Sequence, residues 1–139
     1  MRCVVLVLTF LLLARHGAAQ EPVRPIGPEE ALKKVDQKVT VLMEVKSTGG
    51  NTARYLNSET DFRFEKNFAI FIPNIALAAF KKAGIEDPGQ YYKGKTIVVT
   101  GMVVISQERP QIRVENPDQI KLANNGVPAA AAVKRGKAK

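Results

Sequence analysis

Residues 91–120, YYKGKTIVVTGMVVISQERPQIRVENPDQI, hold the pattern that decides the fold. From residue 96 to residue 105 the side chains alternate between two faces, and one face collects Ile97, Val99, Gly101, Val103 and Ile105. Period-two alternation with β-branched residues is typical of a strand. Residues 106–110 are polar and end in a proline, as a hairpin loop does, and a second strand follows. The stretch therefore predicts a β-hairpin that closes a small antiparallel barrel.

The residues before this hairpin predict three further strands, at 38–46, 53–57 and 68–72, and helices at 29–35 and 74–83. Residues 47–52, with Gly49 and Gly50, are expected to form a loop, and residues 87–94 a turn-rich link. The order of elements matches a mainly β fold, the five-stranded OB-type Greek-key barrel with a helix between strands 3 and 4. A short mixed sheet with one helix is the alternative, and it would leave exposed edges. Gly101, in mid-strand, indicates a bulge or a close backbone approach.

The two ends of the chain differ in composition from the middle. Residues 1–19 resemble a secretory signal peptide, because Arg2 precedes an apolar run of ten residues and small residues follow at 17–19. A membrane-spanning helix needs about twenty apolar residues, so no stable span is expected after cleavage. The expected domains are a signal peptide (1–19), a proline-containing linker (20–28), an OB-fold domain (29–122) and a disordered basic Ala/Lys-rich tail (123–139). The predicted location is secreted or periplasmic.

Cleavage of such a signal removes the only cysteine, Cys3, and the only histidine, His16. The remaining chain then lacks the usual zinc ligands and the commonest general base. None of its serines lies in a G-x-S-x-G elbow. We therefore predict a protein that is not an enzyme and has no cofactor and no metal site, with a carboxylate-only, metal-dependent hydrolase as a minor alternative.

The basic character of the chain comes largely from its ends. The whole sequence carries 21 basic and 13 acidic residues, a net charge of +8, but residues 20–122 carry 15 basic and 13 acidic residues, a net charge of +2. The charge of the body alone is thus weak evidence for a polyanion-binding surface.

Three blocks of the sequence resemble a known group of domains. They are FAIFIP at 68–73, YYKGKTIVVTG at 91–101 and RPQIRVENPDQI at 109–120. Together they are similar to small exported bacterial OB-fold domains of nucleic-acid-binding-like type, with the pattern YxGKxIxVxG followed by RPQIxVxxPxQI. The resemblance covers residues 39–122 and implies the OB fold, whereas a fold alone does not establish a function.

In OB barrels, ligands lie across the second and third strands, between the loops that join strands 1–2 and 4–5. Mapped onto this sequence, that location predicts a nucleic-acid-binding set of basic, aromatic and amide residues: Lys46, Arg54, Tyr55, Asn57, Phe62, Arg63, Phe64, Lys66, Arg109 and Arg113. Cations beside aromatic rings suit single-stranded nucleic acid. For each residue, an ordinary place in the core or on a solvated surface remains the alternative.

The sequence thus predicts an exported, non-catalytic binding module for single-stranded DNA or RNA, or for another extended anion. The near-neutral body favours an alternative, an envelope interaction or stress protein that binds a protein, a glycan or a small cation.

Overall fold

The computed structural model describes residues 24–123. The predicted signal peptide lies outside the described residues, as does the predicted tail after residue 123. None of the helices in the described part is long and apolar enough to cross a membrane.

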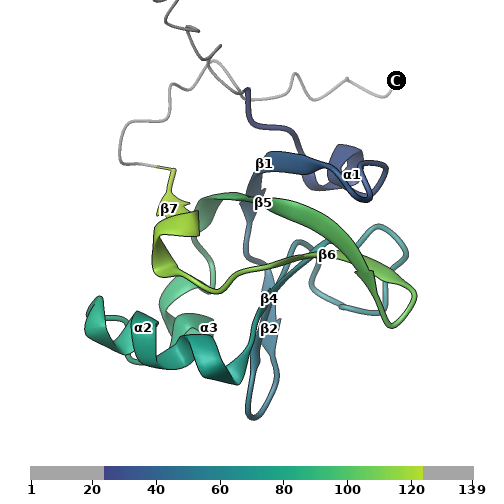
Figure 1. Ribbon diagram of the computed structural model, residues 1–139. Coiled ribbons are helices and arrows are strands. Elements are labelled where there is room, and N and C mark those ends of the chain that lie inside the picture. Colours follow the sequence, from purple (N-terminus) through teal and green to yellow (C-terminus); the bar gives the residue numbers. More distant parts are fainter. Residues whose placement is uncertain (1–23, 124–139) are drawn as a thin grey trace, which may run out of the picture.

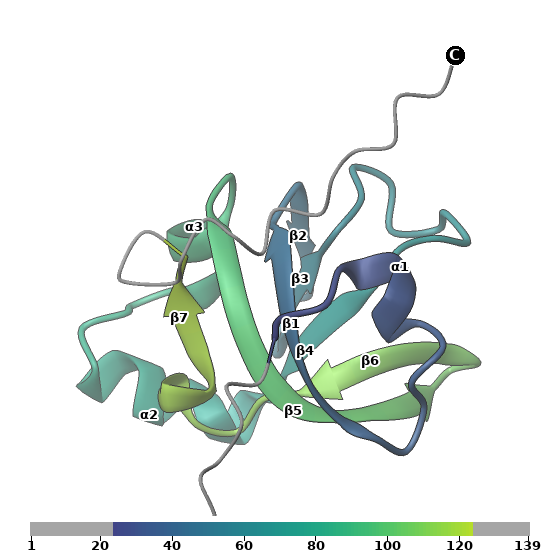
Figure 2. The same ribbon diagram turned by 90° about the horizontal axis from the view of Figure 1, so that it is seen from above.

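In this described part, seven strands form one curled, mixed sheet (Figure 1). They are β1 (Lys38–Glu44), β2 (Ser47–Gly49), β3 (Arg54–Asn57), β4 (Ala69–Ile72), β5 (Thr96–Ser106), β6 (Arg109–Arg113) and β7 (Ile120–Leu122). The helical segments are α1 (Pro28–Ala31), α2 (Leu77–Lys82) and α3 (Pro88–Tyr92), with 3₁₀ turns η1 (Asn74–Ala76) and η2 (Pro117–Gln119). Helices α2 and α3 lie toward one end of the molecule and the β5–β6 turn lies at the other (Figures 1 and 2).

The sheet curls because its two end strands are consecutive in the chain. The strand order is β1-β5-β6-β4-β3-β2, antiparallel throughout except for the parallel pair β4–β6. Only Val45 and Lys46 separate β1 from β2. The Val45 N–H donates to the Lys95 carbonyl at 2.9 Å, whereas the Lys46 N–H donates to the Asn57 carbonyl at 3.0 Å. Within two residues the chain therefore changes partner from the β5 side to β3, and the sheet bends round on itself (Figure 2).

The predicted mainly β, OB-like architecture is confirmed, and residues 24–123 hold seven strands where five were expected. The single strand expected at 38–46 is interrupted at the change of partner, and its continuation β2 occupies residues expected to form a loop. Strand β7 adds a short pair with β5. The expected helix is η1 followed by α2, and the link at 87–94 contains α3, which begins where Asp87 accepts a hydrogen bond from the Gly89 N–H at 2.8 Å.

The predicted hairpin is present with a tighter turn than expected. Gln107 and Glu108 both have positive φ, 49° and 63°, as in a two-residue turn between antiparallel strands. Pro110, expected in the loop, lies in β6 and pairs with Ile105 of β5. A proline is tolerated there because β4 pairs with β6 only from Gln111 onward.

The core lies inside the curled sheet. Ile97, Val99 and Val103 of β5 are fully buried with Ile112 of β6, as their alternation predicts. Ile105 belongs to the same face of β5 but is 52% exposed, because it lies at the two-stranded end of the hairpin beyond the β4 pairing.

At Gly101 a neighbour does approach closely, but it is a side chain and not the backbone expected from the sequence. A Cβ atom added to Gly101 would lie 2.6 Å from Cγ2 of Ile112, closer than carbon atoms pack. Since Ile112 is β-branched and fully buried, it has little room to move away. The absence of a side chain at residue 101 therefore lets β6 close over β5.

We predict that Gly101→Ala lowers the free energy of unfolding by about 1–3 kcal/mol, the usual cost of overpacking a core. Urea unfolding followed by circular dichroism measures it. Gly49→Ala is the matched control, because a Cβ there meets nothing within 4 Å and its stability should stay within about 0.5 kcal/mol of wild type. Equal stability of the two variants would contradict the packing argument.

Candidate functional site

A groove of about 500 Å³ lies on the outer face of the sheet, and we call it the outer groove. Its floor is a cross-strand row from β2, β3, β4 and β6, formed by Ser47, Asn57, Ala69 and Gln111. In each of β3, β4 and β6 the neighbouring residue points into the core, so strand alternation turns the row outward. Small Ala69 in the middle of the row leaves the groove open.

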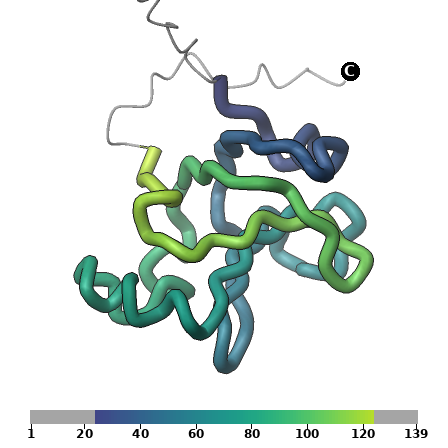
Figure 3. Tube along the Cα trace, viewed as in Figure 1, coloured from purple at the N-terminus to yellow at the C-terminus, as the bar shows by residue number. Residues whose placement is uncertain are grey.

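Two loops form the walls of the outer groove. One is the loop between β3 and β4, residues 58–68, and the other is the β5–β6 turn, which lies beside it (Figure 3). The base of the 58–68 loop is closed by Ser58 and Phe68, because the Ser58 N–H donates to the Phe68 carbonyl at 3.0 Å and the Phe68 N–H donates to Ser58 Oγ at 2.8 Å.

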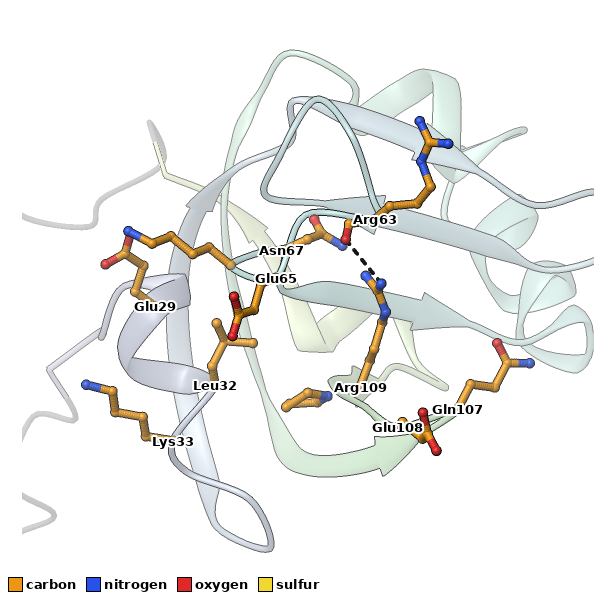
Figure 4. Close-up of a pocket in the computed structure, with 11 residues that line it drawn as sticks. Glu29, Leu32, Lys33, Arg63, Glu65, Asn67, Gln107, Glu108 and Arg109 are labelled. Atoms are coloured by element: carbon orange, nitrogen blue, oxygen red, sulfur yellow. Dashed lines mark hydrogen bonds and ion pairs between the residues drawn. The ribbon is translucent and has the colours of Figure 1, made fainter.

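Arg109 ties the two walls together. From the first residue of β6, its guanidinium donates to the main-chain carbonyls of Phe62 and Arg63, the latter at 3.2 Å. The same side chain also faces a second cavity, of about 790 Å³, between the 58–68 loop, the turn and α1 (Figure 4). Arg109 therefore holds the part of the 58–68 loop that carries Phe62 close to the β5–β6 turn.

Aromatic rings flank the groove and continue along the sheet beside it. Tyr55 lines the groove and packs against Phe71 of β4, with ring centroids 5.0 Å apart and planes at 39°. The Arg113 guanidinium lies 5.8 Å from the Phe71 ring centroid. Phe62 and Phe64 are 61% and 62% exposed, but only Phe62 lines the groove.

Three buried amides meet at the groove. Asn57, Asn67 and Gln111 are 5%, 5% and 8% exposed, and all three line it. The Glu59 N–H donates to Asn67 Oδ1 at 3.1 Å, and Asn67 Nδ2 donates to Asn57 Oδ1 at 3.2 Å. The Glu59 carbonyl in turn accepts from Ser47 Oγ at 2.7 Å, which fixes this end of the chain of hydrogen bonds.

Within residues 24–123, the basic residues of the predicted set have acidic partners, apart from Arg109. The ion pairs are Lys46–Glu59, Arg54–Asp87, Arg63–Asp61, Lys66–Glu29 and Arg113–Glu115, at 3.4, 2.9, 2.8, 3.4 and 2.7 Å. Hydrogen bonds from the Arg63 side chain and backbone lower the pKa of Asp61 to about 2. The surface around the groove is therefore close to neutral.

Arg54 differs from the other cations because it is part of the framework. Its guanidinium donates to both carboxylate oxygens of Asp87, at 2.9 and 3.3 Å, and to the carbonyls of Asn51 and Ala53. Asp87 also caps α3, so this pair joins α3 to β3. The Arg54 hydrogen bonds are the main cause of the lowered pKa of Asp87.

The structure brings together four of the ten predicted residues, namely Tyr55, Asn57, Phe62 and Arg109, in the outer groove. The other six lie outside it: Lys46, Arg54, Arg63, Phe64, Lys66 and Arg113. Sequence reasoning missed Asn67 and Gln111. For Gln111 a signal existed, because it alternates with the core residue Ile112, but nothing in the sequence placed Asn67 against Asn57.

Residues 24–123 contain no cluster of three or more Asp, Glu, His or Cys side chains placed to hold a metal ion.

No protein-family model and no curated protein matches the chain. Among solved structures, the chain is similar to OBody AM1L10 bound to hen egg-white lysozyme, with 14% identity, a TM-score of 0.50 and coverage of 73% of this chain and 95% of that one. It also overlays on asparaginyl-tRNA synthetase from Pyrococcus horikoshii (13%, TM-score 0.49, 73% of this chain) and aspartyl tRNA synthetase from Entamoeba histolytica (13%, TM-score 0.47, 88%). It spans only 23% and 28% of those two synthetase chains. At such identities the likeness to the OBody concerns the fold alone, and it agrees with an OB-like architecture.

We predict that Asp87→Asn lowers the free energy of unfolding by about 1 kcal/mol at pH 7. Asparagine keeps an oxygen for the Gly89 N–H but loses the ion pair with Arg54. Because the pKa of Asp87 is lowered in the folded state, the stabilisation is complete above the unfolded value of about 4 and is lost as the pH falls through the folded-state pKa.

Urea unfolding at pH 7, 4 and 3 checks this prediction. The gap between wild type and Asp87→Asn should close as the solution is acidified. Asp61→Asn, which breaks the exposed pair between the near neighbours Asp61 and Arg63, is the control and should change stability less than Asp87→Asn at pH 7, because solvent screens that pair. A gap of constant size at all three pH values would show that the ion pair is not its cause.

Proposed function

We propose that this chain is a non-catalytic binding module that holds single-stranded nucleic acid, or another extended anion, in the outer groove. In this proposal β1 and β2 act as one bent strand of a five-stranded OB-type barrel. The observation that carries it is the convergence of Tyr55, Phe62, buried amides and Arg109 on the outer face of β3 and β4. That is where OB barrels bind oligonucleotides and oligosaccharides.

Stacking would supply most of the affinity. A base on an aromatic side chain contributes about 1–3 kcal/mol, and the contribution varies little with sequence because every base has a π face. Phe62 is exposed at the rim of the groove and is held in place by the bond from Arg109 to its carbonyl. Tyr55 is half-buried against Phe71, so its orientation is already fixed.

Charge would supply little of the affinity. Exposed ion pairs such as Lys66–Glu29 contribute about 0–1 kcal/mol, so a phosphate can displace the carboxylate at small cost. The displaced carboxylate stays nearby, however, and residues 20–122 carry a net charge of only +2. We therefore expect a weak dependence of binding on salt.

A second candidate function is an envelope interaction protein that binds a protein or a glycan. It is favoured by the pairing of the cations around the groove, which suits an uncharged ligand better than a polyanion. The similar OBody was solved bound to a protein, lysozyme.

Fluorescence anisotropy with labelled 12-nucleotide DNA and RNA tests the first candidate. The chain should carry serine in place of the four basic tail residues Lys134, Arg135, Lys137 and Lys139, so that the groove alone is measured. We expect binding to persist, with a slope of log K against log salt of about −1.4, the value for two phosphates. The native tail should steepen the slope by up to about 3.

Phe62→Ala should weaken this binding by about 1–3 kcal/mol, the contribution of one stacked base. Phe64→Ala is the matched control, because Phe64 is equally exposed on the same loop but lies outside the groove. Equal effects of the two substitutions, or loss of all binding with the tail charges, would reject the groove as a nucleic-acid site and leave the second candidate.

Export is also part of the proposal. When the full chain is produced in a cell with a general secretion pathway, the exported protein should begin at Gln20, as intact mass will show. A large residue in Ala19→Phe should block the cut. Recovery of the uncut chain from the cytoplasm in both cases would contradict export.

A further inference from the structure

The orientation of the amides in the outer groove is fixed by a backbone group. The Glu59 N–H can only donate, so the Asn67 atom 3.1 Å from it must be the oxygen. The other end of that amide is then the NH₂ group, which donates to Asn57 at 3.2 Å. The Asn57 atom that receives this bond must therefore be its oxygen.

We call these two hydrogen bonds, from Glu59 to Asn67 and from Asn67 to Asn57, the amide relay. The amide relay leaves the NH₂ end of the Asn57 amide for a ligand. Among the described residues, Asn57 Nδ2 has no hydrogen-bond partner, although the residue is only 5% exposed. Within residues 24–123 no fully buried side-chain nitrogen or oxygen lacks a partner, so Nδ2 must be reachable from the groove that Asn57 lines. Asn57 thus presents its NH₂ donors at the floor, while its oxygen is turned toward Asn67 and bonded to it.

Gln111 is different. It lines the same floor on the far side of Ala69 and is 8% exposed, and no other described residue bonds to its side chain. No hydrogen bond from a described residue fixes the orientation of its amide, so it can donate to a ligand or accept from one. Gln111 can add affinity for either kind of ligand group, but only Asn57 favours a ligand group that accepts a hydrogen bond.

The geometry of a nucleotide determines which group would reach Asn57. A single strand lying on the sheet keeps its sugar and phosphates outside the groove, so the deepest part of a pyrimidine is the substituent on C4, opposite the glycosidic nitrogen. That substituent is a carbonyl oxygen in uracil and thymine and an amino group in cytosine. In purines the group on C6, a carbonyl in guanine and an amino group in adenine, reaches deepest.

We propose that the outer groove selects bases with a carbonyl at this position, uracil, thymine and guanine, over cytosine and adenine. Asn57 is the residue that contacts the base, and Asn67 is a positioning residue that fixes the polarity of Asn57. An amino group on the base would face the Asn57 NH₂ donor to donor and lose a hydrogen bond on burial. This inference rests on the proposed function, since it needs a base in the groove.

The test compares anisotropy titrations of labelled oligouridine and oligocytidine, twelve nucleotides each, at pH 7.5, again with serine at the four basic tail positions so that sequence-blind binding by the tail is removed. The two bases have the same size and differ in their hydrogen-bonding edge. We expect oligouridine to bind about fivefold to tenfold more tightly, the effect of one hydrogen bond.

Asn67→Asp is the decisive variant, because aspartate has the shape of asparagine but reverses the direction of the hydrogen bond with Asn57. The new carboxylate can still accept from the Glu59 N–H, but it can only accept from Asn57, so the Asn57 amide must turn and present its oxygen to the groove. The preference should then invert, with oligocytidine bound more tightly. A residue that merely supported the fold would weaken both ligands equally and could not invert their order.

Two further variants keep the test decisive if Asn67→Asp does not fold. Asn57→Asp, which places acceptors on the floor, should also invert the order of the two ligands. Gln111→Ala should weaken both ligands and keep the preference for oligouridine.

The outcomes separate the inference from the proposed function. Equal affinity for both ligands in wild type, with binding still weakened by Phe62→Ala, would overturn the base preference and leave the proposed function in place. A preference that survives both Asn67→Asp and Asn57→Asp unchanged would overturn the role of the relay. Absence of binding to either ligand would overturn both proposals.

Discussion

The change of partner at Val45 and Lys46 is the constraint on which the rest of the structure depends. Buried backbone donors and acceptors must find partners, and a flat sheet would leave those of β1 and β2 at opposite edges. The Val45 backbone bonds to Gly94 and Lys95, and Lys46 to Asn57, so the two edges are joined by adjacent residues. The curvature that results encloses the core and turns Asn57 outward, at the end of β3 beneath the 58–68 loop.

The outer groove is a consequence of this curvature and of one small side chain. Curling brings the β5–β6 turn beside the 58–68 loop, where Arg109 can bond to the Phe62 and Arg63 carbonyls. Ala69 lies below them between two amide side chains and leaves the space that a larger residue would fill. The groove is therefore assembled from five strands and three loops that are distant in sequence. Its depth depends on the 58–68 loop being held at both its base and its tip.

The sequence predicts those features that depend on neighbouring residues, such as which face of a strand is buried. It misses those that depend on pairing between residues distant in the chain. The alternation of side chains in β5 and β6 predicted that Ile97 and Ile112 are buried. The glycine at residue 101 predicted that another part of the chain approaches β5 closely there. The end of the first strand was misplaced because the break at Val45 depends on partners fifty residues away. Likewise Arg54 was grouped with ligand-binding cations because its partner Asp87 is 33 residues distant. The amide relay escaped notice for the same reason: alternation marks Asn57 and Gln111 as outward, but only the folded loop brings Asn67 to them.

A groove of this kind discriminates between ligands by a different principle from a basic surface. Phosphate contacts contribute affinity without regard to sequence, and here most of the nearby cations already have carboxylate partners. A buried amide with one end fixed acts in the opposite way, because its benefit depends on the polarity of the group it meets. A mismatched ligand group leaves two donors facing each other out of reach of water, which costs more than the matched bond gains. In the proposed function, the near-neutral surroundings of the groove would strengthen that selectivity, because they add little sequence-blind attraction of their own. The paired charges and the buried amides are thus consistent with the proposed function, in which hydrogen-bond polarity, more than net charge, would decide what the groove holds.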